Sequence, residues 1–137
     1  MAIKLTIVTP EGTAFDGPVD SVVLPGSEGD FGVLEHHERF LAPLRAGKVE
    51  IRTENETQYA AIAKGFADVS GERVVVLVDS CELASEIDLA RAERALDRAR
   101  EKLSELRADD EADARHAHEA EEALARALTR IEVAGRK

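Results

Sequence analysis

The amino-acid sequence predicts two parts, a β-sandwich or barrel over residues 1–84 followed by an antiparallel helical hairpin over residues 85–137. The first observation concerns Gly and Pro, because nine of them precede Leu44 whereas residues 87–133 contain none. The second is that Val, Ile and Thr are frequent in the first part and favour strands. The third is that apolar residues in the second part recur at steps of three and four, as on one face of a helix.

Short strands separated by turn residues account for the first part. Apolar and polar residues alternate over 3–8 until a Pro and a Gly interrupt them, and later runs end at similar turn residues. The turns at 54–56 and 70–72 are predicted to close hairpins. Many short strands at this density are typical of a sandwich or barrel. The predicted strands are 3–8, 13–15, 19–24, 33–34, 40–44, 48–53, 57–62, 66–69 and 73–78.

The last predicted strand differs from the others because residues 74–78 are all apolar. A strand with one exposed face alternates apolar and polar residues, whereas a run without alternation indicates that both faces are covered. We therefore expect one face of this strand to pack in the core and the helical hairpin to cover the other.

Two helices are predicted between Ile87 and Ala134. The acidic segment 108–113, which contains good N-cap residues, separates them. Each buried CH₂ contributes about 0.8 kcal/mol to stability, and a seam rich in Ala buries few of them. The hairpin is therefore expected to be only marginally stable alone and able to pack against different partners. The seam residues are Leu89, Ala92, Leu96, Ala99, Leu103 and Leu106 in the first helix, and Ala117, Ala120, Leu124, Ala127 and Ile131 in the second.

The chain has 137 residues and a formal net charge of −10. No part carries the basic excess that contact with phosphates requires, so nucleic acid is not an expected partner. Cys81 is the only cysteine, which excludes an internal disulfide and agrees with a reducing compartment. The sequence contains neither a leader-like apolar segment nor an apolar run of about 18 residues. Membrane association is therefore expected only through a partner.

Catalytic chemistry has little support in the sequence. His36 and His37 are adjacent and would point to opposite sides of a strand, whereas His116 and His118 lie about 200° apart around a helix axis. No nucleophile motif, phosphate-binding loop or metal-ligand spacing occurs. The histidines are expected to be ordinary surface residues, and the chain is expected to be neither an enzyme nor a metal-binding protein.

Four segments taken together resemble the epsilon subunits of bacterial F-type ATP synthases. They occur in the family's order and at its spacing, and they extend over essentially the whole chain. The family's fold is an N-terminal ten-stranded β-sandwich followed by a C-terminal antiparallel α-helical hairpin, which agrees with the prediction from the residues. The four segments are 26–34, 64–69, 74–77 and 87–92.

The resemblance implies a rotor subunit of the central stalk that couples proton translocation to ATP synthesis. Its expected partners are the gamma subunit and the c-subunit ring, which the β domain would bind. A further partner is the alpha/beta catalytic hexamer, which the C-terminal helices would enter in an extended form to inhibit ATP hydrolysis. The expected location is the cytoplasmic face of the bacterial plasma membrane, where the chain would be peripheral and held only through the complex.

Three groups of residues match family contact sites. In members that bind ATP, a motif of Ile or Leu, Asp, two unspecified residues, Arg and Ala begins the first helix, and arginines further along take phosphate oxygens. No cofactor is required, and regulatory ATP competes with the alternative of a solvent-exposed, ion-paired helix face. The matches are Glu82, Ile87, Asp88, Arg91, Ala92, Arg98, Arg126 and Arg130 for ATP, Arg115, Arg126 and Arg130 for the beta subunit, and Glu28, Asp30 and His37 for the c-ring.

Two positions depart from the family pattern. Glu35-His36-His37 stands where the family usually has Pro-Gly-His, and Lys64 stands where it has the first Gly of Gly-Gly-Phe. The first change removes a Pro-Gly turn at the expected ring-facing end, and the second replaces a residue that adopts positive φ at little cost. Without the resemblance, the residues also allow a soluble ligand-binding sandwich with a helical interaction tail.

Overall fold

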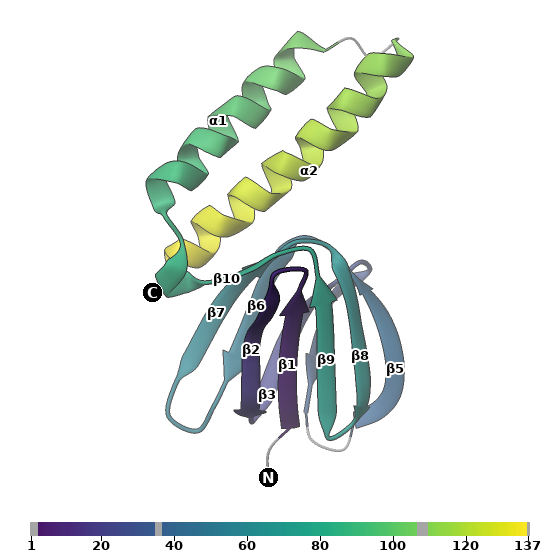
Figure 1. Cartoon of the computed structure of the whole chain (residues 1–137), viewed down its shortest axis with the longest axis vertical. Helices are drawn as coiled ribbons and strands as arrows, with labels where there is room; N and C mark the ends of the chain where they lie inside the picture. The colour runs from purple at the N-terminus through teal and green to yellow at the C-terminus, as the bar shows by residue number, and fades with distance from the viewer. Residues whose placement is uncertain (1–2, 35–36, 107–109, 137) are drawn as a thin grey trace.

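A computed structural model of the chain describes residues 3–34, 37–106 and 110–136. Over these residues, strands are followed by a short 3₁₀ helix and two α-helices that rise from one end of the β domain (Figure 1). None of the described helices is long and apolar enough to cross a membrane. The elements are β1 Ile3–Thr9, β2 Gly12–Val19, β3 Ser21–Gly26, β4 Gly29–Val33, β5 His37–Leu44, β6 Gly47–Arg52, β7 Thr57–Ile62, β8 Gly65–Gly71, β9 Arg73–Val78, β10 Cys81–Leu83, η1 Ala84–Glu86, α1 Leu89–Glu105 and α2 Glu111–Ala134.

The described strands form one ten-stranded sheet in the order β10-β7-β6-β3-β5-β8-β9-β1-β2, with β4 paired to β3. The sheet folds over where β3 meets β5 through the single pair Gly26 and Leu44, so that two layers face each other (Figure 1). All strand pairs are antiparallel except β1 with β9. The prediction of a β-sandwich followed by a helical hairpin is confirmed. The largest fully buried side chains between the layers are Ile3, Leu5, Ile7, Val19, Val22, Leu24, Val33, Val49, Ile51, Val69, Val74 and Val76.

The predicted strands correspond to β1 through β3 and β5 through β9, whereas the strand predicted at 33–34 shares only Val33 with β4. The other differences lie at short or interrupted segments. β10 was not predicted because it has only three residues, Cys81–Leu83. β2 runs through Gly17 and Pro18, which were predicted to form a turn. Pro18 is tolerated because β2 is the edge strand of the sheet, where a missing N–H leaves no neighbouring carbonyl without a donor.

The expectation that the hairpin covers the outer face of β9 is wrong. Val74, Val76 and Val78 are buried in the core, but Leu77 on the opposite face is 52% exposed. The second helix, α2, contacts β6 and β7 in the other layer, because β10 pairs with β7 and starts the hairpin at that edge. The outer face of β9, with Leu77, is therefore left uncovered by the hairpin.

Each of the two helices has an aspartate as its N-cap, and that of the second helix lies in the predicted acidic segment. The Asp88 carboxylate accepts a hydrogen bond from the Arg91 backbone N–H, and the Asp110 carboxylate accepts from the backbone N–H groups of Ala112 and Asp113. These bonds satisfy N–H groups that have no partner within the helix. Residues 108 and 109, the start of the predicted break at 108–113, lie outside the described residues.

The small-residue seam is present, with an exception at its beginning. Ala92, Leu96 and Ala99 of α1 and Ala120 and Ala127 of α2 are buried. Leu89, which was predicted to belong to the seam, is 42% exposed. Leu89 is the first residue of α1, directly after its N-cap Asp88.

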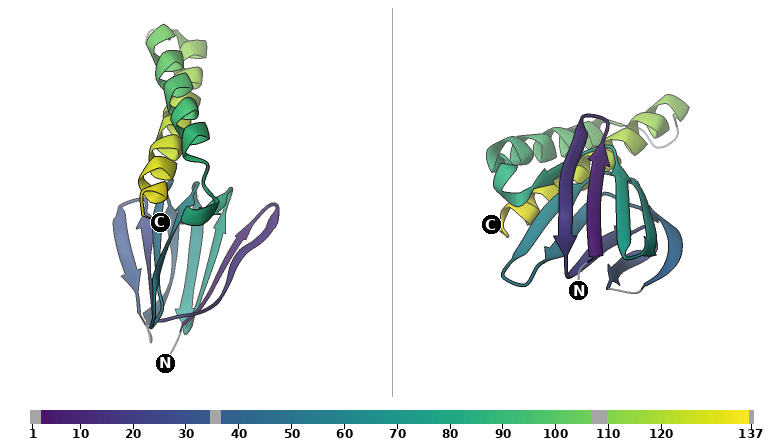
Figure 2. Two further views of the ribbon diagram at one scale, coloured as in Figure 1. Left: turned by 90° about the vertical axis from the view of Figure 1, so that its left-hand side faces the viewer. Right: turned by 60° about the horizontal axis from the view of Figure 1, so that its bottom comes forward.

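The hairpin meets the β domain at the end of α2. Val133 and Ala134 pack with Ala61 of β7, Ala84 of η1 and Ile87, and Tyr59 packs against the same group. We call these six residues the anchor. The hairpin therefore leaves the β domain as α1 and returns to it as the last turn of α2 (Figures 1 and 2).

We predict that Gly65→Ala destabilises the β domain. A Cβ at this position would lie 2.0 Å from the carbonyl oxygen of Leu77 and 2.8 Å from Cα of Val78, so the β8–β9 pair would have to move apart. Overpacking of this kind costs about 1–3 kcal/mol or more. Gly32→Ala in β4 is the matched control, because a Cβ added there would meet nothing within 4 Å. Chemical denaturation followed by circular dichroism should show a lower midpoint for Gly65→Ala alone, and equal midpoints would contradict the prediction.

Candidate functional sites

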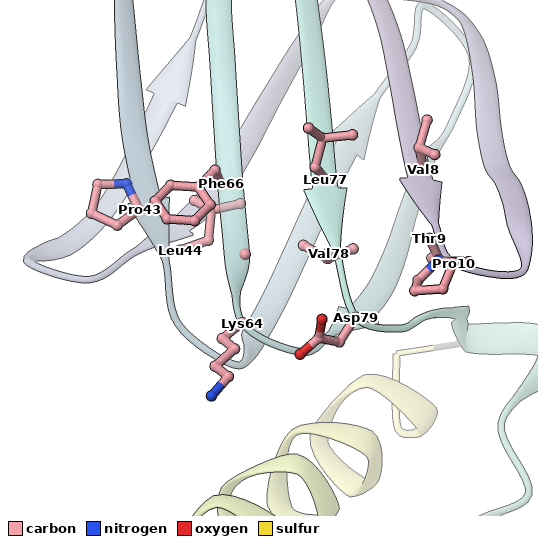
Figure 3. Close-up of a pocket in the computed structure, with 11 residues that line it drawn as sticks. Val8, Thr9, Pro10, Pro43, Leu44, Lys64, Phe66, Leu77, Val78 and Asp79 are labelled. Carbon is pink, nitrogen blue, oxygen red and sulfur yellow. The ribbon is translucent and has the colours of Figure 1, made fainter.

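An apolar row crosses the outer face of the β5-β8-β9-β1 layer. Pro43 pairs in register with Phe66, Phe66 with Leu77, and Leu77 with Val8, so four neighbouring strands each contribute one residue. Phe66 is 54% exposed and Leu77 is 52% exposed. Figure 3 shows these side chains side by side at the end of the sheet nearest the helices. Contiguous exposed apolar residues of this kind mark surfaces that bind another macromolecule.

A hollow of about 530 Å³ lies over this row and is open to solvent. Pro10 closes it on the β1 side, and Lys64 and Asp79 lie at its rim (Figure 3). The surface is thus apolar at its centre and charged at one edge. This is the usual composition of a protein–protein interface, in which charges are depleted at the core and retained at the rim.

A second candidate site lies at the start of the hairpin. A small hollow of about 140 Å³ brings together most of the residues expected to bind ATP. They come from β10, the start of α1 and the end of α2, which are adjacent because of the anchor. The residues are Glu82, Glu86, Ile87, Asp88, Arg91, Ala92 and Arg130.

The remaining expected ATP residues, Arg98 and Arg126, line an adjoining groove of about 380 Å³ between the two helices. Arg130 lines both spaces, so the two lie next to each other. Lys102 also lines the groove, whereas its remaining lining residues are all Ala. Four cations over a floor of small residues give the groove a positive charge that suits an anion. The small hollow is below the range of about 300–1,000 Å³ typical of ligand sites, whereas the groove falls within it.

Two of the acids in the small hollow already have structural roles. Glu82 pairs with Arg130, and both side chains are about one-third exposed. Asp88 caps α1. An anion that binds here must therefore share Arg130 with Glu82, while the described residues that line the groove with Arg98 and Arg126 include no acid.

The residues expected to contact the c-ring do not lie together. Glu28 and Asp30 lie at the turn between β3 and β4, where Asp30 forms an ion pair with Arg45. His37 begins β5 in register with Gly71, whereas the other end of β5 pairs with Gly26. His37 is therefore at the opposite end of the β domain from Asp30. His36 lies outside the described residues.

Comparison with known proteins decides the family. A sequence model of the ATP synthase delta/epsilon chain β-sandwich domain matches residues 2–84, and a model of the long α-helix domain of the same chain matches residues 85–135. The chain belongs to the ATP synthase delta/epsilon chain family. The resemblance stated from the sequence segments is thus confirmed.

Relatives of this delta/epsilon chain match it over nearly its full length. ATP synthase epsilon chain 2 of Syntrophotalea carbinolica is 41% identical over 98% of this chain and 94% of its own length. The ATP synthase epsilon chain of Syntrophobacter fumaroxidans is 42% identical over 96% and 95%. Among solved structures, a chain of the Euglena gracilis mitochondrial ATP synthase, OSCP/F1/c-ring assembly, has a TM-score of 0.79 and 28% identity, with 97% of this chain and 81% of that chain covered.

A chain of the Tetrahymena thermophila mitochondrial ATP synthase central stalk and c-ring has a TM-score of 0.62 over 99% of this delta/epsilon chain and 96% of its own length. Its identity is 13%, so this likeness concerns the fold alone.

Arg115, expected to contact the beta subunit, is distant from the other two arginines of that group in this delta/epsilon chain. It lies near the start of α2 and is exposed, and eleven residues of helix separate it from Arg126, about 16 Å along the axis. Arg126 is also exposed, and Arg130 is half-buried. A single partner surface reaches all three only if it runs along α2.

Sequence reasoning missed three features of the sites. The apolar row was not predicted, although Phe66 and Leu77 are large apolar residues at outward positions of their strands. Lys102 and Glu86 were not assigned to the nucleotide site. A third hollow, of about 800 Å³, lies between the β domain and α2 and was not foreseen; Lys64, His118, Glu122 and Arg126 are among its lining residues. Among the described residues, no cluster of His, Cys, Asp and Glu could hold a metal ion.

Two titratable groups near these sites have shifted pKa values. Burial raises the pKa of the Cys81 thiol to about 11, and the nearby carboxylates of Glu86 and Glu82 contribute to this rise. The Lys64 ammonium, through a hydrogen bond and its charge, lowers the pKa of the Glu122 carboxyl, and His118 and Arg126 act in the same direction. Glu122 therefore stays ionised to lower pH than an isolated glutamate, whereas Cys81 stays a neutral thiol.

We predict that Cys81 reacts slowly with alkylating reagents in the folded chain. With a pKa of about 11, about one thiol in a thousand is ionised at pH 8, and the thiolate is the reactive form. Alkylation by iodoacetamide at pH 8 should be on the order of a hundredfold slower than that of a cysteine in an unstructured peptide. The chain unfolded in guanidinium chloride is the control and should react at the peptide rate. Equal rates for the folded and unfolded chains would rule the assignment out.

Proposed function

We propose that this chain is the epsilon-type subunit of the central stalk of an F-type ATP synthase, a rotor component that couples proton translocation to ATP synthesis. The observation that carries the proposal is the exposed apolar row on a β domain of this family. In the isolated chain, Phe66 and Leu77 of the row are more than half exposed, at 54% and 52%. The gamma subunit, which the family resemblance implies as the partner, would bury the row in the assembled stalk.

The β3–β4 turn supplies the contact proposed for the c-subunit ring. Glu28 and Asp30 are exposed, and the ion pair with Arg45 leaves the Asp30 side chain about half accessible. His37 is not part of the same contact, because it lies at the other end of β5. We therefore restrict the proposed ring contact to the turn, with Arg45 as a neighbour that holds Asp30 in position.

The hairpin is the proposed regulatory part. In the folded form, Arg98 and Arg126 face a common groove and Arg130 reaches Glu82. In an extended form, α2 would carry Arg115, Arg126 and Arg130 to the beta subunit of the alpha/beta hexamer and inhibit ATP hydrolysis. Regulatory ATP would favour the folded form because its phosphates need arginines from both helices at once.

The proposed ATP synthase assembly also implies a location and a role for the chain. The chain would lie at the cytoplasmic face of the bacterial plasma membrane as a peripheral component, attached through the gamma subunit and the c-ring. Catalysis would belong to the alpha/beta hexamer, and the chain itself would be a non-catalytic regulatory subunit. ATP would act on it as an effector, since the groove offers cations for phosphate binding.

We predict that Leu77→Asp prevents binding to the gamma subunit. A charge at the centre of the apolar row would be buried without a partner, and residues at interface centres typically cost 2 kcal/mol or more when lost, about thirtyfold in affinity. Leu34→Asp is the matched control, because Leu34 is 64% exposed and lies outside the row. Copurification of coexpressed gamma with the tagged chain should fail only for Leu77→Asp, provided that circular dichroism shows both variants folded. Retention of gamma by Leu77→Asp would exclude the row as the docking surface.

We predict that Arg126→Ala weakens both ATP binding and inhibition. Loss of one charge-assisted hydrogen bond costs about 1.5–3 kcal/mol, or about tenfold or more in affinity. Arg100→Ala is the control, because Arg100 is an exposed arginine of α1 outside both hollows.

Titration calorimetry of the isolated chain with ATP measures the first effect, and ATP hydrolysis by the assembled enzyme measures the second. Arg126→Ala should change both, and Arg100→Ala should change neither. If the unaltered chain does not bind ATP, the nucleotide part of the proposal fails while the stalk assignment stands.

A further inference from the structure

The hairpin touches the β domain at a second point, about ten residues before the anchor. Lys64 Nζ, in the loop between β7 and β8, lies 3.2 Å from Glu122 Oε2 of α2. On the same helix, His118 Nε2 lies 3.1 Å from Glu122 Oε1. Glu122 thus joins a cation of the β domain and an imidazole of its own helix. We call the Lys64–Glu122 pair the latch.

The surroundings of the latch differ from those of the anchor. The hollow of about 800 Å³ between the β domain and α2 lies at the latch, so the two surfaces are not closely packed there. The Lys64 side chain is 64% exposed and that of Glu122 is 31% exposed. Ala63, Ser80 and Ala125, which line the same hollow, are too small to fill it. The attachment at this point is therefore electrostatic.

The anchor is held mainly by burial of apolar side chains, beside one partly exposed ion pair. Val133 is fully buried and Ala134 is 8% exposed. The Tyr59 ring lies between two cations, with Lys48 Nζ 5.8 Å and Arg136 Cζ 5.4 Å from its centroid. Lys48 also pairs with Glu132 at 3.2 Å. Apolar burial and cation–π contacts depend little on salt, whereas an exposed ion pair is screened by it.

We propose that the latch opens while the anchor stays closed, so that the folded hairpin pivots as a unit about the last turn of α2. Glu122 lies about 15 Å along the helix from Glu132. Because the latch is this far from the pivot, it restricts the direction in which the hairpin points. Opening separates α2 from the loops at 45–46, 63–64 and 79–80 without parting the two helices. Opening widens the hollow along the β-domain-facing side of α2, where His118 and Arg126 are already exposed, so that a partner has room to bind there before the hairpin itself unfolds.

The chain provides independent reporters for the two points. Tyr59 is the only tyrosine and the chain has no tryptophan, so intrinsic fluorescence reports the anchor alone. The direction of the hairpin can be followed by double electron–electron resonance between spin labels at Ala114→Cys and Glu72→Cys, both exposed, in a Cys81→Ser background. Ala114 is in the first turn of α2, and Glu72 is at the far end of the β domain.

Raising sodium chloride from low to high concentration should broaden the distance distribution between the labels while Tyr59 fluorescence stays constant. Lys64→Ala and Glu122→Gln should each give the broad distribution at low salt, with about a two- to fivefold rise in the undocked population, as expected for an exposed ion pair. The charge exchange Lys64→Glu with Glu122→Lys should restore the narrow distribution. Glu119→Gln, an exposed acid of α2 outside the hollow, is the control and should change nothing.

Two results would overturn the proposal. A narrow distribution in high salt and in both latch variants would mean that the hairpin and the β domain form one rigid body. A change in Tyr59 fluorescence together with the label distance would mean that the hairpin leaves the β domain in one step. Circular dichroism of each variant establishes that it is folded, and the salt titration of the labelled chain with an intact latch gives the answer without any latch substitution.

Discussion

Burial of the last turn of α2 against the β domain is the contact on which the hairpin and its candidate site depend. Val133 is fully buried, with Ala61 and Ile87 in the same cluster. Burial of one Val side chain stabilises by about 1.5–3 kcal/mol as an upper estimate, whereas an exposed ion pair contributes about 0–1 kcal/mol. The apolar contact therefore decides whether the hairpin is docked, and the ion pairs decide its direction. Because the contact fixes the end of α2 beside β10, it also brings Arg130 to Glu82.

The fold could be predicted largely from local patterns, and each failure had a physical cause. Strand alternation and helical spacing report burial against the chain itself, so they located both helices and every strand from β1 to β9 except β4. They failed for β10, which is too short to show a period, and for Pro18, whose edge position is a property of the whole sheet. They failed also for residues 74–78, because an apolar outer face looks the same in sequence whether this chain or another one covers it.

The candidate sites required more than local pattern. The family motif at the start of α1 named Asp88 and Arg91, and the structure brings them to one hollow with Arg130. Spacing alone could not have found that group, because Arg130 reaches it only through the docking of α2. The Lys64–Glu122 pair shows the same limit. Lys64 stood out in the sequence as a departure from the family pattern, but its partner is set by the angle at which the hairpin meets the β domain.

Charged side chains of α2 take part in two separate equilibria. One is the pairing of α2 with α1, and the other is the attachment of α2 to the β domain. Arg126 lines both the basic groove and the hollow at Glu122, and Arg98 of α1 lies across the groove from it. A ligand shifts an equilibrium only by its difference in affinity between the two states. An anion in the groove has such a difference for the pairing of α1 with α2, because arginines of both helices face it only when they are together. It has little difference for the latch, since Glu122 keeps Lys64 as a partner whichever way Arg126 turns. A nucleotide bound as proposed would therefore act on the closure of the hairpin, whereas ionic strength would act on its attachment to the β domain.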